Sequence, residues 1–179
     1  MTVVTGILLV GGGSSRFGSP KALARLGGKT LVELAWERLA WCDERIAVGK
    51  VADRLPLPFP LLDDGSDVRA PIVGLVAGLR AASCDLVVAL PVDLPLITDE
   101  ALRTLVFHCT ADAAVPQTGP LPGAYRRSVI PVLERSIRAG KLGLRGALTE
   151  LAVRVVALDP ILLTNVNSIE DLPLSPGKP

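Results

Sequence analysis

The sequence predicts an α/β fold with a mostly parallel sheet in a single domain. Short apolar or β-branched runs alternate with longer segments whose apolar residues recur near a 3.6-residue period, which is typical of strands joined by crossover helices. The chain has 179 residues, of which 49% are hydrophobic, and this suits one compact domain with a sizeable core. We therefore predict one domain over residues 1–179, in which residues 174–179 form a frayed tail.

The expected strands and helices alternate along the chain. The first strand, at residues 3–10, is rich in Val, Ile and Leu and ends at a glycine cluster. Thr98 is the expected N-cap of a helix, because Asp99 and Glu100 place acidic side chains in the first turn that follows it. Further strands are predicted at residues 45–48, 60–62, 85–90, 113–115 and 153–158, and helices at residues 30–42, 72–82, 99–108 and 128–139.

The charge and cysteine content exclude several classes of partner. The chain has 19 Lys and Arg against 18 Asp and Glu, so no chain-wide field is available for nucleic acid or an anionic membrane. The apolar runs are broken well before the ~20 residues that span a bilayer, and the N-terminal run lacks the basic start of a signal peptide. The cysteines, Cys42, Cys84 and Cys109, show no CxxC spacing and fit reduced thiols in a core. We expect a cytoplasmic protein that binds neither nucleic acid nor membrane.

A glycine-rich loop follows the first predicted strand, with the sequence Gly11-Gly-Gly-Ser-Ser-Arg-Phe-Gly-Ser-Pro-Lys21. Glycines let backbone N–H groups converge on an anion, and Arg16 and Lys21 add positive charge. A dinucleotide-binding fingerprint fails at Arg16, where it requires glycine, and a Walker A loop fails at Ser19, where it requires lysine. A tight turn remains the alternative for the glycines alone, and the two cations favour a triphosphate cradle.

Two aspartates follow predicted strands, at the place where ligands bind to sheets of this kind. Asp93 follows an apolar strand and lies two residues before a proline, so its carboxylate is held at the strand end, where Mg²⁺ takes such a ligand together with waters and phosphate oxygens. A helix cap is the alternative role, although Thr98 already serves the next helix. Asp64 follows the third strand and is placed to accept hydrogen bonds from a guanine or a ribose, with Asp63 as its rival.

Two asparagines near the C-terminus are candidates for the same metal site. Asn165 and Asn167 occupy alternate positions, so in an extended segment both amides point to one side of the chain. An ordinary turn before a short helix is the alternative and is favoured for Asn165. Asn167 is therefore the expected second ligand of Mg²⁺, beside Asp93.

The loop from Leu9 to Lys21 resembles the signature of the pyrophosphorylase-type nucleotidyltransferases, and in particular the molybdenum cofactor guanylyltransferases of the MobA type. The resemblance continues, in order and spacing, through residues 62–64, 70–79, 91–95, 123–127 and 165–172. It implies a Rossmann-like three-layer α/β/α nucleotidyltransferase fold with a mostly parallel mixed sheet. It also implies an N-terminal half that binds the nucleoside triphosphate and a C-terminal half that binds the acceptor.

Taken position by position, the loop and the resemblance give the expected site residues. Two departures from the family pattern stand out: Pro20, where an aspartate is usual, and Gly49, where an asparagine often touches the nucleotide. Both bear on base and ribose recognition more than on the type of reaction. The expected catalytic residues are Arg16, Lys21 and Asp93, the metal ligands are Asp93 and Asn167, and the nucleotide contacts are Leu9, Val10, Gly11, Gly12, Gly13, Lys21, Asp64 and Asp93.

The reaction that the resemblance implies is guanylylation of the molybdenum cofactor. A terminal phosphate of molybdopterin attacks the α-phosphate of GTP and displaces pyrophosphate, which leaves molybdopterin guanine dinucleotide and needs no protein nucleophile. Catalysis would rest on alignment and on charge neutralisation by Mg²⁺, Arg16, Lys21 and loop N–H groups. Expected partners are GTP, molybdopterin, and other cofactor-biosynthesis proteins or molybdoenzyme chaperones.

Two alternatives stay open. The first is a cytidylyltransferase of the same fold that acts on a related pterin or alcohol phosphate; the adjacent Gly11 and Gly12 favour guanine, because cytidylyl relatives tend to carry alanine at the first of these positions. The second is a non-catalytic nucleotide-binding regulator. The joint presence of Arg16, Lys21 and Asp93 favours an enzyme.

The acceptor phosphate is expected to meet cations of the C-terminal half. The net charge is only +1, so an anionic acceptor needs a local positive surface, and the cations of the glycine loop are already committed to the triphosphate. Arg126, Lys141 and Arg145 are the candidates. Solvated residues at helix ends are the alternative interpretation for Arg126 and Lys141, and Arg145 is the favoured specific contact.

Overall fold

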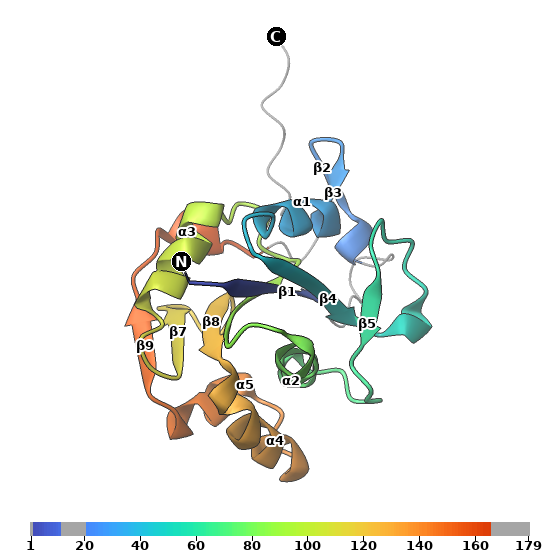
Figure 1. Cartoon of the computed structure of the whole chain (residues 1–179). Coiled ribbons are helices and arrows are strands. Elements are labelled where there is room, and N and C mark those ends of the chain that lie inside the picture. Colours follow the sequence, from blue (N-terminus) through green and yellow to red (C-terminus); the bar gives the residue numbers. More distant parts are fainter. Residues whose placement is uncertain (1, 12–20, 166–179) are drawn as a thin grey trace.

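A seven-stranded sheet crosses the molecule in the order β5-β4-β1-β6-β8-β7-β9 (Figure 1). The computed structural model describes residues 2–11 and 21–165. Neighbouring strands pair in parallel except at β8, which is antiparallel to both β6 and β7. The mostly parallel mixed sheet is therefore confirmed. The strands are β1 Val4–Val10, β4 Glu44–Gly49, β5 Leu61–Asp63, β6 Leu86–Pro91, β7 Ala113–Pro116, β8 Gly123–Arg126 and β9 Val153–Val156.

Helices cover both faces of this sheet and complete the three layers. Figure 1 shows α1 and α3 on one face and α2, α4 and α5 on the other. A small hairpin, β2 (Arg25–Leu26) and β3 (Lys29–Thr30), leads into α1. The helices are α1 Leu31–Arg38, α2 Pro71–Ala81, α3 Asp99–His108, α4 Ile130–Arg138 and α5 Leu144–Ala147, and 3-10 turns lie at residues 21–23, 51–53, 127–129, 148–150 and 160–163. None of the described helices is long and apolar enough to cross a membrane.

Strand β1 contributes side chains to both of the large hydrophobic clusters of the core. All seven of its residues are buried, and their side chains alternate between the faces, as the period of a strand requires. Leu8 and Val10 belong to the cluster beneath α1 and α3. Ile7 and Leu9 belong to the cluster beneath α2 and α4.

Side-chain caps fix where α1 and α3 begin. Thr98 Oγ1 accepts a hydrogen bond from Ala101 N at 3.2 Å, so the predicted N-cap is confirmed. Thr30 and Glu33 form a reciprocal capping box at the start of α1. α1 ends at Arg38, before the predicted end at residue 42, because Ala40 N and Cys42 N bond to carbonyls three residues back instead of four.

The cysteines pack in the interior as free thiols. Cys84 and Cys109 are buried and Cys42 is partly buried, in line with the expectation from their spacing. Burial raises the pKa of Cys42 to about 12. Burial also raises the pKa of Cys109, so both thiols stay protonated at neutral pH.

Gly78 lets α2 approach β1 more closely than any side chain would allow. A Cβ at this position would lie 2.6 Å from Ile7 Cδ1 and 2.8 Å from Ile7 Cγ2. Ile7 is fully buried in the central strand, so it has little room to move away. The contact between α2 and the sheet therefore depends on glycine at residue 78.

We predict that Gly78→Ala destabilises the protein by up to about 2 kcal/mol. Alanine favours a helix over glycine by about 1 kcal/mol, but overpacking against Ile7 costs about 1–3 kcal/mol and outweighs that gain. Urea or thermal unfolding measures the difference. Gly146→Ala in α5 is the matched control, because a Cβ there meets nothing within 4 Å among the described residues. A Gly78→Ala protein as stable as the control variant would contradict the packing argument.

Candidate functional site

The carboxyl ends of four parallel strands lie at one edge of the sheet, and several of the predicted site residues lie there. β1, β4, β5 and β6 run in the same direction, and such an edge is where ligands bind in open α/β sheets. The residues that follow these strands are Gly11 after β1, Lys50 after β4, Asp64 after β5 and, two positions on, Asp93 after β6.

Lys21 and Asp93 meet on the β6 side of β1. Lys21 opens the 3-10 turn at residues 21–23, and its Nζ lies 3.2 Å from Asp93 Oδ2. Both side chains are only partly exposed, at 15% and 28%. The structure thus brings together two of the three predicted catalytic residues from positions 72 residues apart. Arg16, Gly12, Gly13 and Asn167 lie outside the described residues.

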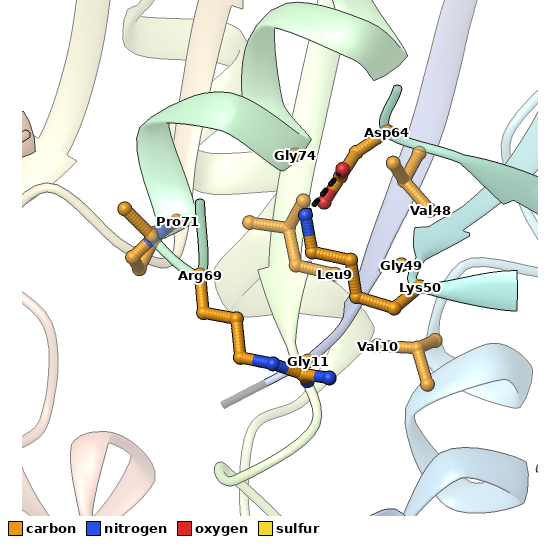
Figure 2. Close-up of a pocket in the computed structure, with 11 residues that line it drawn as sticks. Leu9, Val10, Gly11, Val48, Gly49, Lys50, Asp64, Arg69, Pro71 and Gly74 are labelled. Carbon is orange, nitrogen blue, oxygen red and sulfur yellow. Dashed lines mark hydrogen bonds and ion pairs between the residues drawn. The ribbon is translucent and has the colours of Figure 1, made fainter. Parts of the chain in front are cut away.

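A pocket opens on the β4 side of β1 (Figure 2). Most of its wall is apolar side chain and glycine, and Asp64 supplies a carboxylate. Of the predicted nucleotide contacts, Leu9, Val10, Gly11 and Asp64 line it. The full lining is Leu9, Val10, Gly11, Val48, Gly49, Lys50, Asp64, Arg69, Ala70, Pro71 and Gly74.

The structure separates Asp64 from its rival Asp63. The Asp63 carboxylate accepts hydrogen bonds from Gly65 N at 2.8 Å and from Val51 N at 2.9 Å. These two backbone donors hold the pKa of Asp63 below its ordinary value. Asp63 therefore stabilises the loop, whereas Asp64 faces the pocket.

Lys50 is a pocket residue that the sequence analysis missed. Its Nζ donates to Asp64 Oδ1 at 2.6 Å, to Val68 O at 2.9 Å and to Ser66 O. Figure 2 shows the Lys50 and Asp64 side chains pointing toward each other. The sequence did contain a signal for Lys50, because it follows a predicted strand. Gly11, Asp64 and Asp93 were selected as candidates for that same reason.

Arg69 is a second missed residue, at the rim of the pocket. Its two terminal nitrogens contact the Asp53 carboxylate at 2.9 and 2.6 Å, in a bidentate pair. The hydrogen bonds to Arg69 lower the pKa of Asp53. Asp53 belongs to the 3-10 turn after β4 and Arg69 precedes α2, so this pair joins the two loops that form the pocket wall.

Gly49 departs from the family pattern for a steric reason. A Cβ built at Gly49 would overlap the carbonyl oxygen of Val10 on the neighbouring strand. An asparagine therefore does not fit at this position without a shift of β4 against β1. The polar side chain that this segment supplies to the pocket comes instead from the next residue, Lys50.

The three predicted acceptor residues do not lie at the same edge of the sheet. Arg126 ends β8, which is antiparallel, so it pairs in register with Leu86 at the start of β6. Its guanidinium contacts Asp85 Oδ2 at 3.0 Å. Arg145 lies near the carboxyl ends, where its Nη2 donates to Thr118 O at 2.7 Å beyond the end of β7. Lys141 is exposed after α4.

The pairing of these cations also differs. Within residues 2–11 and 21–165, neither Lys141 nor Arg145 has a carboxylate within ion-pair distance. Arg135 and Arg138 of α4, by contrast, pair with Glu150 and Glu134. Lys141 and Arg145 are thus available for an external anion, whereas Arg126 is already neutralised by Asp85.

Asp93 offers a fitting ligand for a hard divalent cation. Its carboxylate is partly exposed at the strand end, and Mg²⁺ commonly takes one or two carboxylates and completes its shell with water and phosphate oxygens. No group of three or more His, Cys, Asp or Glu side chains suited to a metal occurs in the described part of the chain. The Asp93 carboxylate therefore fits an ion whose other ligands include water and phosphate oxygens.

Comparisons with known proteins identify the family and agree with the fold. A family model described as the MobA-like NTP transferase domain matches residues 6–155. A molybdenum cofactor guanylyltransferase from Desulfosudis oleivorans is 30% identical, over 96% of this chain and 94% of its own. A probable molybdenum cofactor guanylyltransferase from Deinococcus radiodurans is 32% identical, over 96% of this chain and 93% of its own. The crystal structure of molybdopterin-guanine dinucleotide biosynthesis protein A from Archaeoglobus fulgidus superposes with a TM-score of 0.77 at 25% identity, covering 94% of each chain.

Proposed function

The chain belongs to the MobA-like NTP transferase family, and on that premise we propose that it transfers GMP from GTP to the terminal phosphate of molybdopterin. The products are pyrophosphate and molybdopterin guanine dinucleotide. The protein is a nucleotidyltransferase enzyme. One observation supports this substrate assignment. At the carboxyl edge of the sheet, an apolar pocket with Asp64 lies on one side of β1, and the Lys21–Asp93 pair lies on the other side.

The two sides of β1 suit the two ends of a nucleoside triphosphate. The apolar pocket suits the base and the ribose, because it offers stacking surface and a carboxylate acceptor. Lys21 and Asp93 suit the phosphates, together with the glycine loop that continues from Gly11. A triphosphate bound in this way would cross the end of β1, with its base between β4 and α2.

The residues on the phosphate side perform alignment and charge neutralisation. Lys21 would hold a phosphate oxygen and stabilise the negative charge that develops as pyrophosphate leaves. Asp93 would hold Mg²⁺, which when bound neutralises charge on the phosphates. Arg16 and Asn167 remain proposed contributors from the sequence. A Ser, Cys or His nucleophile is unnecessary, because the acceptor phosphate is itself the nucleophile.

Guanine is the favoured base over cytosine for a chemical reason. Guanine presents two adjacent donors, N1–H and the 2-amino group, to an acceptor such as Asp64. Cytosine presents one amino donor beside an unprotonated ring nitrogen, and a carboxylate repels that lone pair. The carboxylate in the pocket therefore supports GTP over CTP, in agreement with the adjacent Gly11 and Gly12.

The acceptor is proposed to bind beyond β7, in the C-terminal half. Arg145 lies near the carboxyl edge, and neither Arg145 nor Lys141 has a carboxylate partner among the described residues, which supports a role for both in holding the acceptor phosphate. Arg126 is not part of this proposal, because β8 carries it to the opposite edge. The free thiols support a reducing compartment such as the cytoplasm. Cofactor-biosynthesis proteins or molybdoenzyme chaperones are the proposed protein partners.

The direct test is pyrophosphate release from GTP and from CTP, each with Mg²⁺ and molybdopterin. We expect release with GTP to exceed release with CTP by at least about tenfold, the factor that one discriminating polar contact supplies. Faster release with CTP would move the chain to the cytidylyltransferase alternative. Nucleotide binding without release of pyrophosphate from either substrate would favour the non-catalytic regulator.

Asp93→Asn should lower pyrophosphate release by at least about 100-fold, because it removes a charged phosphate-side ligand from the transition state. Stability should change little, because asparagine keeps the shape of the side chain and a carbonyl oxygen that can accept the hydrogen bond from Lys21 Nζ. Steady-state turnover and thermal unfolding measure the two quantities. Asp99→Asn is the control, a partly exposed carboxylate at the start of α3. Undiminished turnover at saturating Mg²⁺ would rule out the assignment.

The double variant Lys141→Ala with Arg145→Ala should raise the KM for molybdopterin by at least about tenfold, because it removes charge-assisted contacts to the acceptor phosphate. Its affinity for GTP, measured by calorimetry, should stay within about twofold of wild type, since the two ligands lie in different halves. The control is Arg135→Ala with Arg138→Ala, an equal change of charge on α4. A fall in GTP affinity with an unchanged KM would reverse the assignment of the two halves.

A further inference from the structure

Lys50 is a buried ammonium group whose donors are all committed. Only 9% of the residue is exposed, and its Nζ contacts Asp64 Oδ1, Ser66 O and Val68 O. A buried ammonium has three donors and is costly to bury unless each finds an acceptor. Lys50 therefore holds the loop from β5 to α2 at three points along its length.

This arrangement leaves one oxygen of Asp64 for the pocket. Asp64 Oδ1 accepts from Lys50 Nζ at 2.6 Å and from Ser66 N at 3.1 Å, which occupies both of its lone pairs. Among the described residues, no donor contacts Asp64 Oδ2. Lys50 and Ser66 thus fix the plane of the carboxylate and leave Oδ2 as its remaining acceptor, on a residue that lines the pocket.

The pocket wall beside Lys50 is tied by two further interactions of the same kind. Val51 N donates to Asp63 Oδ2 at 2.9 Å, and Arg69 forms its bidentate pair with Asp53. Each joins the segment after β4 to the segment around β5 and α2. Lys50 differs from both because it is buried in the pocket and acts on the carboxylate that faces the ligand.

We propose that Lys50 is the positioning residue for nucleobase recognition, through its hold on Asp64. With Oδ1 occupied, Asp64 Oδ2 accepts from the N1–H and 2-amino edge of guanine, and the fixed carboxylate excludes bases that present a ring lone pair there. This inference rests on the proposed function, since it concerns the base of the nucleotide substrate. It assigns Lys50 no contact with the phosphates.

The test compares Lys50→Met with Lys29→Met by calorimetric titration with GTP, CTP and pyrophosphate in the presence of Mg²⁺. Lys29 is the matched control because its Nζ also pairs with a carboxylate, Glu37, at 2.6 Å, but at an exposed position. We expect Lys50→Met to lower GTP affinity by at least about tenfold and to leave pyrophosphate affinity within about twofold of wild type. The ratio of GTP to CTP affinity should fall toward one. Lys29→Met should change none of these values.

A double-mutant cycle with Asp64→Asn separates positioning from general loss of structure. If Lys50 acts through Asp64, the two substitutions affect the same interaction. The double variant Lys50→Met with Asp64→Asn should then bind GTP about as tightly as the weaker-binding single variant. The double variant also leaves no buried charge unpaired, so it keeps the proposal testable if Lys50→Met alone unfolds. Two results would overturn the role of Lys50. One is a fold-loss of GTP affinity in the double variant equal to the product of the two single fold-losses. The other is an equal loss of affinity for GTP and for pyrophosphate in Lys50→Met. A wild-type protein that binds CTP as tightly as GTP would instead contradict the proposed function before any variant is measured.

Discussion

All seven residues of strand β1 are buried. The neighbouring elements must therefore pack close to its backbone, and every backbone N–H and C=O group of β1 needs a hydrogen-bond partner. The parallel ladders to β4 and β6 satisfy those groups. Glycines provide the close approaches, at Gly78 against Ile7 and at Gly49 against the carbonyl of Val10. Because these contacts fix where β1 ends, they also fix the position of Gly11 and of the ligand edge.

The end of β1 divides the candidate site into two chemically different regions. Toward β6, Lys21 and Asp93 provide opposite charges that suit a phosphate chain and its cation. Toward β4, an apolar pocket carries the Lys50–Asp64 pair. Strand order contributes to this division, because β4 and β6 flank β1 and the segments after them bring Lys50 and Asp93 to the same edge.

Periodic segments with clear end signals could be predicted from the sequence, and features that depend on strand direction could not. The helix at residues 99–108 and its cap Thr98 agree with the structure, because apolar periodicity and acidic first-turn residues are local signals. Strand β8 was missed because its four residues, Gly-Ala-Tyr-Arg, carry no alternating pattern. The position of Arg126 depended on that strand, and its antiparallel direction moves the arginine to the far edge. The contacts of Lys50 with loop carbonyls up to 18 residues away are tertiary and leave no local pattern.

The hydrogen bonds and ion pairs of Lys50, Val51 and Arg69 also affect the free energy of ligand binding in the pocket. Ordering a free loop on binding costs about 1–2 kcal/mol of backbone entropy per residue. Here the segment from Asp63 to Arg69 is already fastened to the segment after β4 by an ammonium, a backbone amide and a guanidinium. That entropy is lost during folding, so a nucleotide meets a pre-organised wall and keeps more of its contact energy as affinity.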